Sequence, residues 1–214
     1  MANWSDPRSG VAGFGNATAA RGEAFDAGLR RYMLSVYNYM ASGVLLTGIV
    51  ALLFASSGLA YQVLAGPGIL KYIIMFAPLA FVMVLSFGIN RLSTATAQAL
   101  YWVYAAVMGL SLSSIFLVYT GTSIAQTFFA TAAAFAGLSL WGYTTKKDLS
   151  GFGTFLIMGV VGLLVASLIN LFLRSSAMDL VISFLGVLLF AGLTAYDTQN
   201  IKNTYLQHAA HSDS

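Results

Sequence analysis

The sequence contains little charge and no cysteine. Only 8% of its 214 residues are charged, and 58% are hydrophobic. A soluble domain carries about 25% charged residues, so this composition excludes an ordinary water-facing surface. The mean hydropathy of +0.80 agrees. The absence of cysteine excludes disulfides and thiolate metal sites. The composition therefore predicts a membrane protein whose chain crosses the bilayer several times.

The sequence also lacks a basic patch, although its formal net charge is +3. The positive residues are scattered between apolar runs, which is not the pattern of a nucleic-acid surface. No glycine-rich phosphate loop occurs either. We therefore expect neither a nucleic-acid partner nor a cofactor, and the lipid bilayer is the expected environment.

Long apolar runs indicate an all-α bundle of transmembrane helices. A bilayer core of roughly 30 Å requires about 20 apolar residues in a helix, and the unequal loops do not fit the alternating segments of a β-barrel. We expect an N-terminal tail over residues 1–31, of which 1–20 are mobile, a bundle over 32–206 and a polar tail over 207–214. The six predicted spans are Tyr32–Ala55, Tyr72–Asn90, Ala97–Tyr119, Thr122–Tyr143, Phe152–Leu173 and Leu180–Tyr196.

The positive residues predict the orientation, because cytoplasmic loops are enriched in lysine and arginine. With a cytoplasmic N-terminus, only Lys71 and Arg174 lie outside. The other positive residues then lie on the cytoplasmic side: Arg8, Arg21, Arg30, Arg31, Arg91, Lys146, Lys147 and Lys202.

Asp197 is an acid at an unexpected place. It directly follows the last apolar run, within FAGLTAYDTQNIK (residues 190–202), whereas the other charged residues of the bundle fall in loops or at span ends. Burying a carboxylate at membrane depth costs on the order of several kcal/mol. The position therefore indicates either a functional carboxylate or the point where the last span leaves the lipid. The polar residues that follow favour the second interpretation.

Arg91 is the favoured partner of this carboxylate. It ends the second predicted span on the same membrane side, and arginine binds carboxylates through a bidentate fork. Lys146 and Lys147, at the end of the fourth span, are the alternatives. Asn170 and Asp179, near the outer ends of the fifth and sixth spans, are further candidates for an ion pathway, although hydrogen bonding between helices is the commoner role of an intramembrane asparagine.

Two segments resemble the transmembrane Bax inhibitor motif family. They are TTKKDLSGFGTFLIMGVVGLL (144–164) and FAGLTAYDTQNIK (190–202), of which KKDLS and AYDTQNIK are specific together. The resemblance covers roughly residues 25–206, and the style of the motif indicates a bacterial inner-membrane member.

The resemblance implies a pH-sensitive calcium leak in which protonation of buried acids shifts a pore between closed and open. The aspartate of the YD motif, here Asp197, belongs to that sensor, and the family's latch arginine matches Arg91. Calcium is then the transported ion, which Asp197 contacts transiently because hard cations prefer carboxylate oxygens. The family pattern has a seventh span with a second aspartate. This chain instead ends in the polar NTYLQHAAHSDS, so we expect six spans and one acid of the pair.

Two other functions remain open. Bacterial relatives are implicated in restraining a membrane-anchored ATP-dependent protease, for which residues 1–31 would be the contact, although a leader that aids insertion is the simpler interpretation. An intramembrane aspartyl protease would need two facing carboxylates. No GxGD stretch occurs, and Asp179 would stand about 27 Å from Asp197 at 1.5 Å per residue. We therefore do not expect an enzyme.

Overall fold

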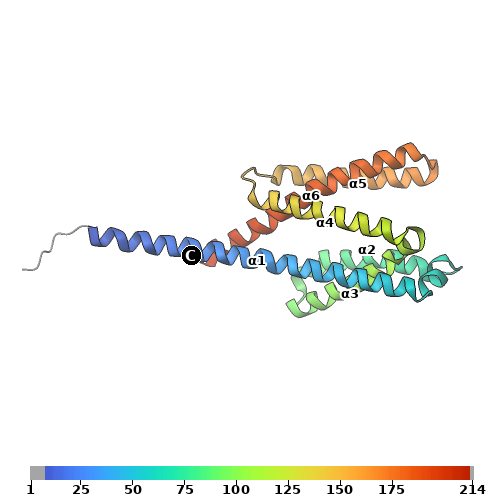
Figure 1. Ribbon diagram of the computed structural model, residues 1–214, viewed down its shortest axis with the longest axis horizontal. Coiled ribbons are helices and arrows are strands. Elements are labelled where there is room, and N and C mark those ends of the chain that lie inside the picture. The colour runs from blue at the N-terminus through green and yellow to red at the C-terminus, as the bar shows by residue number, and fades with distance from the viewer. Residues whose placement is uncertain (1–7, 213–214) are drawn as a thin grey trace, which may run out of the picture. The chain divides into compact units, whose positions relative to one another are not determined.

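Helices make up the regular structure of the described residues. The computed structural model describes the backbone of residues 8–212 and the side chains of residues 22–211. The prediction of an all-α chain is confirmed (Figure 1). The elements are α1 (Arg8–Ser56), the π-helix η1 (Tyr61–Ala65), α2 (Leu70–Gly88), the 3-10 helix η2 (Ile89–Arg91), α3 (Thr94–Val118), α4 (Gly121–Thr144), α5 (Ser150–Leu173) and α6 (Ser176–Ser212).

Six helices of the described chain are long and apolar enough to cross a membrane, as the sequence predicted. Each predicted span lies on one of them, with ends that differ by only a few residues for the four central spans. The breaks fall at the predicted loops, where glycine, proline and polar residues interrupt the apolar runs. The six candidate spans are Gly22–Ser56, Leu70–Arg91, Thr94–Val118, Gly121–Thr144, Ser150–Leu173 and Ser176–His211.

The first and last helices are longer than the sequence predicted. The expected mobile tail is helical from Arg8 onward, its mobility stays a prediction, and residues 1–7 lie outside the described chain. α6 continues through the predicted polar tail to Ser212. The physical reason is that loss of hydrophobicity marks where a helix leaves lipid, whereas the backbone hydrogen bonds of a helix can continue through polar residues.

The described chain forms two compact units. In the unit of residues 35–129, the second half of α1 packs on α3 through small residues. The Thr47 hydroxyl donates a hydrogen bond to the Ala105 carbonyl at 2.8 Å, and the Tyr101 hydroxyl donates to the Tyr39 carbonyl at 2.8 Å. A Cβ atom on Gly109 would lie 2.6 Å from the Thr47 carbonyl oxygen. This close approach is the usual way in which membrane helices associate.

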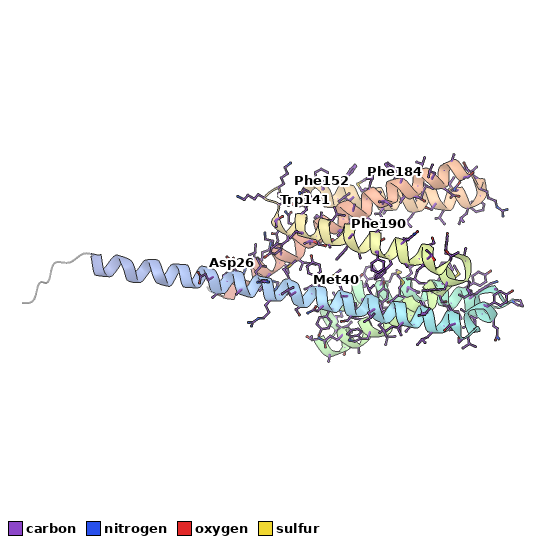
Figure 2. All side chains as sticks on the ribbon, in the orientation of Figure 1. Asp26, Met40, Trp141, Phe152, Phe184 and Phe190 are labelled. Atoms are coloured by element: carbon purple, nitrogen blue, oxygen red, sulfur yellow. The ribbon has the colours of Figure 1, made fainter. Side chains whose placement is uncertain are left out.

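The other unit combines residues up to Leu34 with those from Ala130 onward. α5 and α6 are antiparallel neighbours joined by a short turn (Figure 1). Residues 25–32 of α1 contact the last turns of α6, where the Tyr32 and Tyr205 rings stack with centroids 5.1 Å apart. Phe152 on α5 and Phe184 on α6 (Figure 2) are 59% and 65% exposed. Large apolar side chains in such positions are expected to face lipid.

Candidate functional site

Asp197 lies inside α6 and not at a helix end. The helix continues to Ser212, so the carboxylate is carried by a regular turn. At 1.5 Å per residue, Asp197 and Asp179 stand about 27 Å apart along the helix. This separation is close to the roughly 30 Å thickness of a bilayer core. The two acids therefore mark opposite ends of the apolar stretch of α6, residues 180–196.

The Asp197 carboxylate is on the face of α6 that points away from its neighbours α4 and α5. Ala195, Thr198 and Gln199 are buried, whereas Asp197 and Asn200 are exposed. Successive helical residues are rotated by about 100°, which puts these two sets on opposite faces. Among the described residues of its own unit, Asp197 has no hydrogen-bond or ion-pair partner. A charged group is thus left available on the helix surface.

Gln199, two residues further on, joins the two sequence motifs. Its side chain is 8% exposed. The amide Nε2 donates a hydrogen bond to the Lys147 carbonyl at 2.7 Å, and Oε1 accepts one from the Leu149 backbone N–H at 2.8 Å. A primary amide carries both a donor and an acceptor, so one side chain satisfies two backbone groups of the loop 145–149. AYDTQNIK therefore holds KKDLS in place.

Lys202 holds the end of α4. Its ammonium donates a hydrogen bond to the Tyr143 carbonyl at 2.8 Å and lies 5.0 Å from the centre of the Tyr143 ring. The last four carbonyls of a helix lack partners within that helix, and a cation beside them also interacts favourably with the helix dipole. Lys202 thus caps α4 and contributes a cation–π contact.

The backbones of α4 and α6 approach each other closely beside Asp197. A Cβ atom on Gly142 of α4 would collide with the carbonyl oxygen of Ala195 and would lie 3.0 Å from its Cα. A Cβ atom on Gly153 of α5 would lie 2.5 Å from the Tyr196 ring. The segment that carries Asp197 is therefore packed against α4, α5 and the loop between them. We call this arrangement of residues 195–202 on the loop 145–149 the motif junction.

Asp148, within the same loop, lies just before α5. Its Oδ1 accepts hydrogen bonds from the Ser150 hydroxyl and from the Ser150 N–H. These bonds, the side-chain one first, lower the pKa of Asp148 because they favour the ionised form. Asp148 consequently stays ionised at neutral pH.

The neighbouring lysines are exposed. The side chains of Lys146 and Lys147 form no ion pair with Asp197 in the described part of their shared unit. The structure therefore does not bring these alternative partners to the acid, and their role stays a prediction.

Arg91 is the last residue of η2 and is exposed at the corner between α2 and α3. Ser93 begins α3 as an N-cap, accepting a hydrogen bond from the Thr96 N–H at 3.2 Å, which sets the corner at this point. Arg91 belongs to the unit of residues 35–129 and Asp197 to the other unit. The pairing of these two residues stays a prediction.

Asn170 and Asp179 meet at the other end of the α5–α6 pair. Asn170 is 5% exposed. Its Nδ2 donates hydrogen bonds to the Asp179 carboxylate and to the Ser175 carbonyl, the latter at 3.2 Å. Its Oδ1 accepts a bond from the Ser175 N–H at 3.0 Å. The three candidates for an ion pathway therefore divide into a pair at one end of α6 and Asp197 at the other.

The described residues contain no group of three or more histidine, cysteine or acidic side chains placed to hold a metal ion. Transient contact between calcium and Asp197 stays a prediction.

The sequence analysis did not single out Gln199, Lys202 or Gly142 as site residues. Gln199 and Lys202 could have been found from the sequence, because polar residues three apart in a motif share a helix face. Gly142 could not, because its contact with Ala195 depends on how the helices pack.

Comparison with known proteins places this chain among membrane proteins of one family. Residues 29–213 match the family described as inhibitor of apoptosis-promoting Bax1. An uncharacterized protein of Rickettsia prowazekii is 48% identical over 188 residues, which cover 88% of this chain and 79% of the relative. The inner membrane protein YbhL of Escherichia coli K12 is 48% identical over 177 residues, covering 83% and 76%.

A more distant relative is an uncharacterized membrane protein of Streptococcus pyogenes, 36% identical over 182 residues that cover 84% of this chain and 79% of the relative. No solved structure matched the chain. The six apolar helices, the YD motif and the matches over most of its length lead to one conclusion: this membrane protein belongs to the Bax inhibitor family.

Proposed function

We propose that this protein is a pH-sensitive calcium leak of the bacterial inner membrane, with both chain ends cytoplasmic, gated by Asp197. The observation that carries the proposal is an exposed carboxylate at the end of the apolar stretch of α6, without a partner in its own unit. A carboxylate next to lipid is costly unless it is paired or functional. The family resemblance, which implies that the aspartate of this motif is a sensor, supports the functional reading.

Arg91 is the proposed partner of the ionised carboxylate. An Asp197–Arg91 ion pair would tie the sixth span to the second and hold the pore closed. Protonation of Asp197 removes its charge and weakens this pair. The leak is therefore proposed to rise as pH falls. Lys146 and Lys147 are the secondary candidates for the cation of this latch.

The motif junction supports the mechanism, because it makes the acid-bearing segment rigid. Gln199 and Lys202 fasten α6 to the loop 145–149 and to the end of α4. Asp197 is thus part of a packed segment and not of a frayed helix end. A change of its charge would therefore affect the helices that this segment contacts. Calcium, a hard cation, would contact Asp197 in passing, and a single carboxylate is expected to bind it only weakly.

The test is calcium flux into liposomes that contain the protein, at about pH 6 and about pH 8, on either side of neutrality. The wild-type flux is expected to be larger at the lower pH. Asp197→Asn is expected to give the larger flux at both values, because the neutral amide mimics the protonated acid. Asp148→Asn is the matched control: it removes a carboxylate from the neighbouring loop and keeps an acceptor for Ser150. An unchanged pH profile in Asp197→Asn would contradict the proposal.

The second candidate function, restraint of a membrane-anchored ATP-dependent protease, is favoured by one observation. Residues 8–31 continue α1 as a helix, and Tyr32 and Phe25 pack on Tyr205. A helix fixed in this way could present a surface to a partner. Deletion of residues 1–20 separates the two functions. A leak would persist without these residues, whereas a regulator that acts through them would lose its effect on the protease.

A further inference from the structure

A polar pocket of about 500 Å³ lies between α5 and α6, at the end opposite Asp197. It opens beside the turn that joins the two helices, and nothing in the proposed gate uses it. Its wall combines one basic, one acidic and several uncharged polar side chains with two apolar ones. Most of the lining comes from Ser167, Asn170, Leu171, Arg174, Asp179 and Ser183.

The two charges of the pocket do not neutralise each other. Among the described residues, the Arg174 guanidinium has no hydrogen-bond or ion-pair partner. The Asp179 carboxylate accepts a hydrogen bond from Asn170 through Oδ1, which leaves Oδ2 free. Opposite charges that line one pocket without pairing can each bind a separate group of a ligand.

The local backbone holds both charged residues in place. Arg174 ends α5 with φ 50° and ψ 40°, a left-handed conformation that glycine usually occupies at this position. Its N–H donates a hydrogen bond to the Asn170 carbonyl at 2.7 Å. An arginine kept in a strained backbone conformation points to a use for its side chain. The buried Asn170 donates a hydrogen bond to the Asp179 carboxylate, which holds this side chain in place and leaves it charged.

The pocket lies at the expected level of the lipid headgroups. It is at one end of two candidate membrane spans, and its apolar lining residue Leu171 is 69% exposed. A bare cation in the pocket would be repelled by Arg174, and a bare anion by Asp179. The apolar lining residues Leu171 and Ile182 also favour a ligand that has hydrocarbon chains. A zwitterionic phospholipid meets all of these conditions.

We propose that this pocket binds the headgroup of phosphatidylethanolamine. The phosphate would take the bidentate fork of Arg174. The primary ammonium, which has three donors, would bind Asp179 and the exposed Ser183 hydroxyl. A quaternary choline lacks these donors and is usually held by aromatic rings, and no aromatic residue is among those lining the described pocket. This proposal is independent of the leak and of its gate.

Native mass spectrometry of the detergent-purified chain, titrated with phosphatidylethanolamine, phosphatidylcholine or phosphatidylglycerol, tests the proposal. We expect phosphatidylethanolamine to bind about tenfold more tightly than the others, as expected for one charge-assisted pair. Arg174→Gln and Asp179→Asn should each lose this preference, and Arg174→Lys should keep part of it. Lys71→Gln removes a positive charge near the same predicted membrane face and serves as the control, with the preference intact.

Three results would overturn the proposal. The preference could survive in both Arg174→Gln and Asp179→Asn, confirmed as folded by circular dichroism. Soluble phosphoethanolamine could compete as well as the lipid, which would assign the pocket to a soluble phosphate–amine ligand. Calcium could displace the lipid in the wild type, which would make the pocket a cation site on an ion pathway.

Discussion

The side-chain oxygen of Gln199 accepts a hydrogen bond from the backbone N–H of Leu149 at 2.8 Å. This bond joins α6 to the loop before α5, and the Gln199 Nε2 bond to the Lys147 carbonyl completes the connection. Both bonded residues of the loop lie directly beside Asp148. The motif junction thus links the acid of the YD motif to the start of the fifth span.

Gln199→Ala is expected to destabilise the protein. The change leaves the backbone N–H of Leu149 and the carbonyl of Lys147 without their side-chain partner, at a cost of about 1–3 kcal/mol for each group that water does not reach. Unfolding in detergent, followed by circular dichroism, measures the effect. Asn200→Ala removes the adjacent exposed amide and should change stability by less than about 0.5 kcal/mol. Equal stability of the two variants would show that the junction contributes nothing.

Gly142→Ala tests the close approach of α4 and α6. Its methyl group would meet the backbone of Ala195, which can move only if the helices separate. Such overpacking costs about 1–3 kcal/mol. Gly137, on the same helix, has open space around its Cβ position, so Gly137→Ala should instead stabilise by about 0.5–1 kcal/mol. The same unfolding assay, followed by circular dichroism, compares the stability of the two variants. Equal changes in stability would argue against the close contact.

Asp148 predicts a stability change at low pH. Hydrogen bonds from Ser150 lower its folded pKa below the unfolded value of about 3.9. Its contribution is therefore present at neutral pH and is lost as pH falls through the folded pKa. The stability difference between wild type and Asp148→Ala should shrink below about pH 4. A difference that is constant with pH would contradict the hydrogen-bonded, ionised state of this carboxylate.

The sequence predicted the helices better than their ends. Apolar runs of about 20 residues identify spans because lipid allows few alternatives to a helix. Apolar runs do not predict the polar parts of α1 and α6, which are residues 8–31 and 207–212. Hydropathy reports the surroundings of a helix and not the helix itself.

The candidate site was predictable in part. Asp197 is unusual in sequence alone because an acid follows a long apolar run. Gln199 and Lys202 have partners far away along the chain, at Lys147, Leu149 and Tyr143. The spacing of residues along one helix predicts which of them share a face. It does not predict which loop packs against that face.

The central claim is that the charges of Asp197 and Arg91 together close the leak. A charge swap in the liposome calcium-flux assay tests it most directly. Arg91→Asp and Asp197→Arg should each leave the leak open at about pH 8, because each places like charges in the latch. The double variant restores one charge of each sign, and the account predicts that it is closed at about pH 8. A double variant that leaks as much as either single variant would contradict the latch.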